Sequence, residues 1–129
     1  MELVGLISLL AVLQFVVFGI LVGRARGVYG VKAPATTGHE QFERWFRVHY
    51  NTLEKLIVFL PALWLSGYYV GQYYAAGLGL IYLVGRLLYA VSYTRDPASR
   101  TLGTLVSELP ILIMIIGGII AISLDLAAG

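Results

Sequence analysis

Apolar residues fill four long stretches of this chain, and most of the charged residues are gathered in the segments between them. Three of the four stretches come close to the roughly 20 apolar residues that a helix needs to cross a bilayer. The exception is the second stretch, which is shorter and continues a more polar segment. The pattern predicts four helices, at about residues 2–26, 40–71, 74–95 and 98–126. We therefore expect an all-α integral membrane protein, a four-transmembrane-helix bundle in which residues 1–129 form a single domain.

The second predicted helix differs from the others because its first half is polar. A helix of about 30 residues is roughly 45 Å long, whereas the hydrocarbon core of a bilayer is about 30 Å thick. We expect the polar half to protrude from the membrane or to lie against other protein. Pro61 is expected to kink the apolar half, because proline lacks a backbone N–H and its ring clashes with the preceding turn.

The composition narrows the possible chemistry. Hydrophobic residues make up 59% of the chain and charged residues only 12%, which excludes an ordinary soluble domain. The chain has no cysteine, so it has no disulfide, no thiolate nucleophile and no thiolate metal ligand of its own. Any thiol chemistry requires a thiol that is brought in by a cofactor. His39 and His49 are isolated from each other and form no metal-binding pattern.

The positions of the cations predict the orientation in the membrane. All nine Lys and Arg residues lie between Arg24 and Arg100, and the second loop and both termini carry none. By the positive-inside rule, the first and third loops face the cytoplasm and both termini lie on the opposite side. Met1 and Glu2 precede the first apolar stretch without a basic region, so we expect a retained span rather than a cleaved signal peptide.

The densest polar cluster lies at the start of the second helix. Arg47, Asn51 and Glu54 are spaced i, i+4 and i+7, so they share one face of a helix. A face with a cation, an amide and a carboxylate is suited to a zwitterionic ligand. The alternative is a solvated helix end whose charges pair with neighbours one turn away.

Two further arginines attract attention. Arg86 lies nine residues before Arg95, which places it roughly 13 Å inside the membrane boundary. Because buried charges in membranes are normally paired, we hypothesise an ion pair between Arg86 and either Glu54 or Glu108. One interpretation is that this pair is needed for activity. The alternative is a neutral pair that only locks the helices together. Arg100 lies at the start of the fourth helix, where a guanidinium and the helix N-terminus together favour an anion such as a thiolate. The alternative is a simple membrane anchor.

These residues combine into one spaced pattern. It consists of Phe42-Glu43-Arg44-x-x-Arg47-x-His49-x-Asn51-x-x-Glu54, then Gly85-Arg86-x-x-Tyr89-x-x-x-Tyr93, then Arg100. The pattern resembles the membrane-associated proteins in eicosanoid and glutathione metabolism (MAPEG), and the resemblance covers nearly the whole chain. It implies a four-helix protomer that assembles as a homotrimer, with glutathione as co-substrate between protomers on the cytoplasmic side. The short chain favours a bacterial member in the inner membrane.

The resemblance also implies roles for individual residues. The residues implied to bind glutathione are Arg26, Arg47, His49, Asn51, Glu54, Tyr89 and Tyr93. Of these, Arg26 and His49 are implied to contribute from around the protomer interface, and Arg100 is implied to stabilise the thiolate catalytically. The remaining partners are membrane lipid and a lipophilic substrate that arrives through the bilayer. Neither nucleic acid nor metal is implied.

The resulting prediction is a glutathione transferase, with possible peroxidase activity toward lipid hydroperoxides. The main alternative is a non-catalytic lipid-binding or scaffold protein of the same fold, for which the glutathione motif is expected to be degraded. A small four-span exporter is a further alternative, but such transporters depend on a carboxylate that residues 3–23 lack. Lys55 and Gly27 stand where an eicosanoid-forming branch of the family has a tyrosine and an arginine, so the substrate stays undefined.

Overall fold

The computed structural model describes all 129 residues, and its only regular secondary structure is helical. Its helices are α1 (Glu2–Tyr29), α2 (Glu40–Tyr69), α3 (Gln72–Arg95), the single-turn 3₁₀ helix η1 (Pro97–Ser99) and α4 (Thr101–Ala128). The predicted all-α architecture is confirmed. Three segments are long and apolar enough to cross a membrane: α1, α3 and residues 97–128. The second predicted span, in α2, is not among them, because the first half of that helix is polar.

The helix ends differ from the predicted ones by a few residues, for local reasons. α1 continues to Tyr29 and stops where Gly30 adopts a left-handed conformation with φ of 70°. α4 begins at Thr101 rather than residue 98, because Asp96 accepts a hydrogen bond from the Ala98 amide and opens η1 instead. α2 runs through Pro61 as a single helix.

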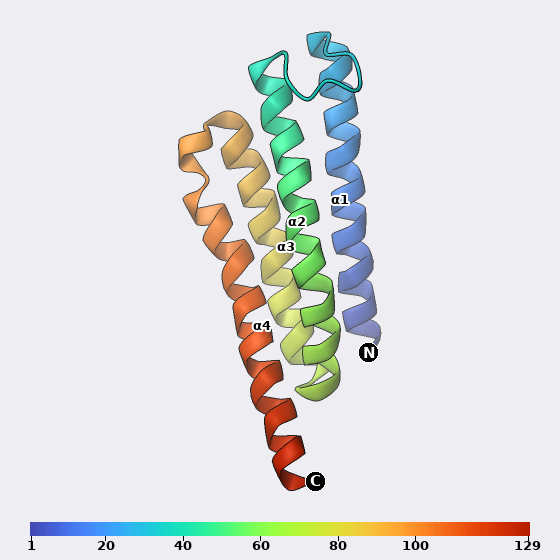
Figure 1. Cartoon of the computed structure of the whole chain (residues 1–129), viewed down its shortest axis with the longest axis vertical. Coiled ribbons are helices and arrows are strands. Elements are labelled where there is room, and N and C mark those ends of the chain that lie inside the picture. The colour runs from blue at the N-terminus through green and yellow to red at the C-terminus, as the bar shows by residue number, and fades with distance from the viewer.

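The four helices lie side by side in a bundle (Figure 1). The α1–α2 loop and the α3–α4 turn are at one end, whereas the α2–α3 turn and both termini are at the other. The two cationic loops therefore share one end of the molecule. α2 and α4 both start at this end, so they run in the same direction.

The core lies where all four helices meet. The fully buried side chains include Val4 of α1, Phe59 of α2, Tyr82 of α3 and Met114 of α4. The rings of Phe59 and Tyr82 stack with their centroids 3.8 Å apart. Many other large apolar side chains point outward, which is the arrangement expected of helices that face lipid.

Glycines bring α3 and α4 close together near the cationic end. A Cβ added to Gly85 of α3 would lie 2.5 Å from the backbone nitrogen of Ser107, and one added to Gly103 of α4 would overlap the backbone of Tyr89. Small residues of this kind allow helix backbones to approach in a membrane. The contact fixes Tyr89 beside the first turns of α4.

Candidate functional site

A polar cavity of about 250 Å³ lies between α2, α3 and the beginning of α4. Four of its lining residues belong to the predicted set: Arg47, Asn51, Tyr89 and Arg100. The other three are Lys55, Thr104 and Glu108. The fold thus brings together residues from three helices that lie up to 61 positions apart (108 − 47) in the sequence.

Two parallel stripes of side chains form the walls of this cavity. Arg47, Asn51 and Lys55 follow one another at intervals of four on α2, and Arg100, Thr104 and Glu108 do the same at the start of α4. Residues four apart lie on one face of a helix, so each stripe faces the other across the cavity. Because both helices start at the cationic end (Figure 1), Arg47 and Arg100 lie nearer that end than Lys55 and Glu108.

Arg86 supports this cavity from behind. Its side chain is only 1% exposed, and its Nη2 donates hydrogen bonds to Asn51 Oδ1 at 2.7 Å and Thr52 Oγ1 at 2.9 Å. Its guanidinium carbon lies 4.5 Å from the centre of the Tyr89 ring. Arg86 therefore holds the amide of Asn51 and the ring of Tyr89 in place, and both line the cavity.

The predicted ion pair between Arg86 and Glu54 or Glu108 is wrong in this structure. Glu108 pairs with Lys55, while Glu54 is exposed and lies outside the cavity. The prediction compared how deep the residues lie along their helices. Whether two residues pair also depends on the direction in which each side chain points around its helix axis. Residue 55 faces α4 and residue 54 does not. The charge of Arg86 is instead compensated by neutral oxygens and an aromatic face.

Tyr93 extends the site toward the cationic end. Its ring stacks on that of Tyr89 with the centroids 5.4 Å apart and the planes at 9°. It lines a neighbouring hollow of about 290 Å³, which it shares with the acidic residues Glu40 and Glu43 and with Arg44. Tyr93 thus touches the wall of the polar cavity but does not line it.

The predicted residues Arg26 and His49 lie elsewhere. Arg26 donates from Nη1 to the carbonyl oxygen of Ala35 at 2.7 Å, within the loop that follows α1. The ring of His49 stacks on Phe15 of α1 with the centroids 4.3 Å apart. His49 therefore faces α1, on the other side of α2 from the cavity. Within one chain, neither residue takes part in the site.

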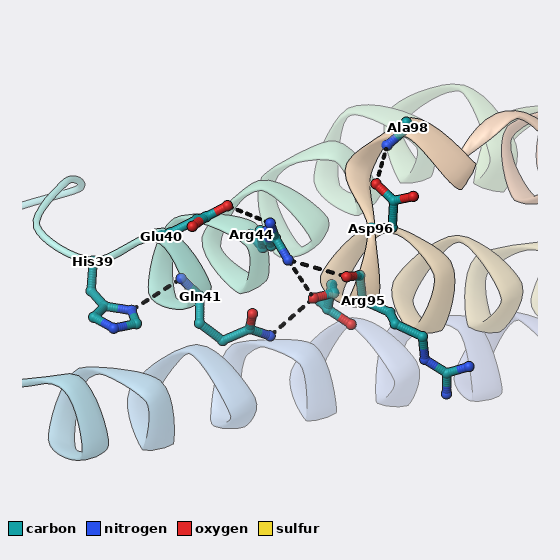
Figure 2. A network of polar contacts seen from close by, with 8 residues as sticks. His39, Glu40, Gln41, Arg44, Arg95, Asp96 and Ala98 are labelled. Carbon is teal, nitrogen blue, oxygen red and sulfur yellow. Dashed lines mark hydrogen bonds and ion pairs between the residues drawn. The ribbon is translucent and has the colours of Figure 1, made fainter.

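A polar network ties the start of α2 to the turn that presents Arg100 (Figure 2). Arg44 forms an ion pair with Glu40, and its Nη1 donates to the carbonyl oxygens of Thr94 at 3.2 Å and Arg95 at 3.3 Å. Gln41 Nε2 also donates to the Thr94 oxygen, at 3.1 Å. These bonds satisfy carbonyls at the end of α3 that have no partner within the helix. The network holds the α3 end, and with it η1, against α2.

The electrostatic character of the cavity is cationic with one acidic position. Arg47, Lys55 and Arg100 are its cations and Glu108 is its carboxylate. Arg100 is also the residue from which α4 starts, so its guanidinium adds to the positive end of the helix dipole. Asn51, Tyr89 and Thr104 supply neutral hydrogen-bonding groups. Such a lining fits a ligand with several anionic groups and one cationic group.

Three lining residues escaped the sequence-based assignment of binding roles. Lys55 was noticed only as a departure from a family pattern, Glu108 only as a partner for Arg86, and Thr104 not at all. The spacing of Lys55 from Arg47 equals that of Glu108 from Arg100, and this equality is the sequence feature that points to them.

An apolar groove of about 300 Å³ follows the same side of the bundle farther from the cationic end. Its walls are residues 57–66 of α2 and 114–122 of α4, among them Val58, Pro61, Ala62 and Ile119. Val58 and Ala62 are three and seven positions after Lys55, so they continue its face of α2.

Comparison with known proteins identifies relatives over most of the chain. A sequence model of the MAPEG family matches residues 4–120. An uncharacterized protein of the cyanobacterium Synechocystis sp. is 47% identical over 118 residues, which cover 92% of this chain and 86% of that protein. Human microsomal glutathione S-transferase 2 is 40% identical over 78% of this chain and 69% of its own length. Leukotriene C4 synthase of Cavia porcellus is 40% identical over 76% of this chain and 65% of its own length.

Proposed function

Because this chain belongs to the MAPEG family of integral membrane proteins, we propose that it is a membrane-bound glutathione transferase with peroxidase capacity. Its relatives microsomal glutathione S-transferase 2 and leukotriene C4 synthase support a glutathione-dependent activity. In this proposal the protein activates the thiol of glutathione for attack on lipophilic electrophiles or lipid hydroperoxides.

The observation that carries the proposal is the polar cavity. It places Arg100 at the start of α4 in the same hollow as Arg47, Asn51 and Tyr89. In this proposal Arg47 and Asn51 bind the peptide's polar groups, and Tyr89 with Tyr93 forms an aromatic wall. The chain has no cysteine, so the reactive thiol is that of glutathione.

Arg100 is the proposed catalytic residue, and its role is electrostatic. A thiol with an ordinary pKa near 8.5 becomes more acidic beside an arginine at a helix N-terminus, because the charge stabilises the thiolate. In the transferase reaction the thiolate sulfur forms a bond to an electrophilic carbon. In the peroxidase reaction two glutathione molecules become a disulfide, while the hydroperoxide becomes an alcohol and water. Neither reaction demands a separate general base once the thiolate has formed.

We further propose that a second protomer completes the site. Arg26 and His49 lie on the α1 side of the molecule, where they cannot reach the cavity of their own chain. In a homotrimer each protomer presents this side to the cavity of its neighbour. The cationic end, which carries the cavity, is proposed to face the cytoplasm.

The lipophilic substrate is proposed to approach from the bilayer. The apolar groove between α2 and α4 is lined mostly by aliphatic side chains and lies deeper along the bundle than the polar cavity. The same groove supports the alternative of a non-catalytic lipid-binding protein. In that alternative the polar cavity binds no glutathione, so there is no thiol to activate. Glutathione binding separates the two functions.

The decisive experiment is a glutathione titration of the detergent-purified protein, followed by the ultraviolet absorbance of the thiolate. We expect saturable binding and a thiolate signal below the ordinary pKa of the thiol. The Arg100→Ala variant is expected to retain binding and to lose that signal. A wild-type protein that binds no glutathione would refute the proposed function and leave the lipid-binding alternative.

A further inference from the structure

A separate hollow of about 180 Å³ lies between the end of α1 and the start of α2. Its walls combine the cation Arg24 with the aromatic residues Tyr29 and Trp45, and Gln41 and three aliphatic residues of α1 complete them. None of these residues lines the polar cavity between α2, α3 and α4. The hollow is therefore a second candidate site, on a different part of the bundle.

The hollow lies at the level where α1 leaves the apolar part of the membrane. Residues 3–23 carry no charge, and Arg24 is the first cation after them. Tryptophan and tyrosine are typical of the boundary between hydrocarbon and headgroups, because their rings are largely apolar and carry one polar group. Arg24, Tyr29 and Trp45 thus place the hollow at the depth of the lipid headgroups.

Arg24 is available to a ligand, whereas nearby arginines are already engaged. Arg26 donates to a loop carbonyl, and Arg44 pairs with Glu40. The guanidinium of Arg24 forms no hydrogen bond or ion pair within the chain, and the residue is exposed. One turn later, a Cβ added to Gly27 would meet no atom within 4 Å. The space around the guanidinium is therefore open to an anionic group.

An apolar track leads from the hollow toward the middle of the membrane. Leu10, Val17 and Arg24 follow one another at intervals of seven on α1, so they share one face of the helix. The two aliphatic residues are 40% and 42% exposed. α3 lies beside this face, because the adjoining Gln14 donates to the carbonyl oxygen of Leu83 at 3.0 Å. An acyl chain on this track lies directly below a headgroup held by Arg24.

The hollow stays accessible in the trimer proposed above. Arg24 and Arg26 are two positions apart, so their side chains leave α1 in nearly opposite directions. In the proposed trimer it is the Arg26 side of α1 that faces the neighbouring protomer. The Arg24 side is then left to face lipid.

We propose that this hollow binds the headgroup of an anionic phospholipid from the leaflet at the cationic end of the protein. The phosphodiester group accepts from the Arg24 guanidinium, Tyr29 and Trp45 flank the headgroup, and an acyl chain lies along Leu10 and Val17. A zwitterionic headgroup fits less well, because its own cation is repelled by the arginine. The inference goes beyond the proposed glutathione chemistry and does not rest on it.

Trp45 can report on its own site, because the chain has only one other tryptophan, Trp64. The Trp64→Phe variant is reconstituted into phosphatidylcholine vesicles, and a small share of the lipid is replaced by phosphatidylglycerol or phosphatidylcholine that is brominated on the acyl chain just below the headgroup. Bromine quenches the fluorescence of a tryptophan that it contacts. We expect the anionic lipid to quench Trp45 at a mole fraction about fivefold lower, which corresponds to about 1 kcal/mol for one basic residue at a membrane surface.

Three further variants, the first two in the same background, serve as tests and controls. Arg24→Gln is expected to abolish the preference for the anionic lipid, and thermal unfolding in detergent checks that this exposed, unpartnered residue is not needed for folding. Lys32→Met removes a cation of the first loop and is expected to keep the preference. In the separate Trp45→Phe variant, Trp64 reports on the other half of α2 and is expected to show no preference.

The outcomes distinguish a lipid site from other sources of quenching. Equal quenching of Trp45 by the two lipids would overturn the inference, since the hollow would select no headgroup. A preference that survives Arg24→Gln would also overturn it, because the attraction would come from the general charge of this end. Inorganic phosphate at matched ionic strength is expected to leave the quenching unchanged, and a loss would identify a free anion as the ligand instead of a lipid. Glutathione binding is measured separately and decides the proposed function by itself.

Discussion

The guanidinium of Arg86 donates a hydrogen bond to Asn51 Oδ1 at 2.7 Å, so a buried cation of α3 orients an amide of α2 that faces the cavity. The same side chain lies against the ring of Tyr89. Arg86 therefore acts on the site through two residues of its wall while its own side chain is almost fully buried.

Replacing Arg86 tests this supporting role. Arg86→Leu leaves the acceptors Asn51 and Thr52 without their donor, which costs about 1–3 kcal/mol for a buried polar group. We expect a lower melting temperature in detergent and weaker glutathione binding. Arg95→Leu, at an exposed arginine of the same helix, serves as the control. Unchanged melting and binding in Arg86→Leu would mean that the network has no consequence.

Arg100→Ala is expected to lower turnover far more than glutathione affinity. In the proposed mechanism the guanidinium stabilises a charge that becomes full only when the thiol ionises, so its removal should slow conjugation about 100-fold or more. The dissociation constant should change only a few-fold. Stopped-flow conjugation and equilibrium titration measure the two quantities, with Arg95→Ala as the control at the same end of the bundle. Wild-type turnover in Arg100→Ala would remove Arg100 from the mechanism.

The pH dependence of turnover follows from the same charge. In the proposed mechanism Arg100 favours the anionic thiolate and so lowers the pKa of the bound thiol below its ordinary value near 8.5. Activity is then fully present above the lowered pKa and is lost as the pH falls through it. We expect the inflection of the Arg100→Ala profile to move up, toward the ordinary value. A pair of profiles with the same inflection would contradict electrostatic activation by this residue.

A mixing experiment tests whether the site is shared between protomers. If Arg26 and Arg100 of one site come from different chains, co-expressed Arg26→Ala and Arg100→Ala subunits form some interfaces with both arginines intact. Random mixing makes about a quarter of the interfaces intact, so activity should return to roughly that fraction of the wild type. If both residues of a site came from one chain, every site would lack one of them and activity would not return.

The glycine contact between α3 and α4 is expected to be intolerant of a methyl group. Gly85→Ala places a Cβ against the backbone of Ser107, which cannot move without displacing the helix, and overpacking of this kind costs about 1–3 kcal/mol. Gly77→Ala, on the same helix with open space around it, is the matched control. Thermal unfolding should show a loss for Gly85→Ala alone. Equal stability of the two variants would show that α3 and α4 can separate without cost.

Most of the fold was determined by the sequence alone. Continuous apolar stretches of this length predict the helices, since a helix satisfies its backbone hydrogen bonds internally in lipid. Glycines and Asp96-Pro97 mark the helix ends. The cations of the first and third loops do lie at one end of the bundle. The family assignment made from the spaced polar motif is also confirmed.

Only the tertiary structure decided which faces meet. Residue spacing states which side chains share a face of one helix, but not which face turns toward a neighbour. That depends on packing, here on the close approach of α3 and α4 at Gly85 and Gly103. This is why Glu108 pairs with Lys55 and not with Arg86, and why Arg47 and Arg100 share a cavity that His49 does not reach.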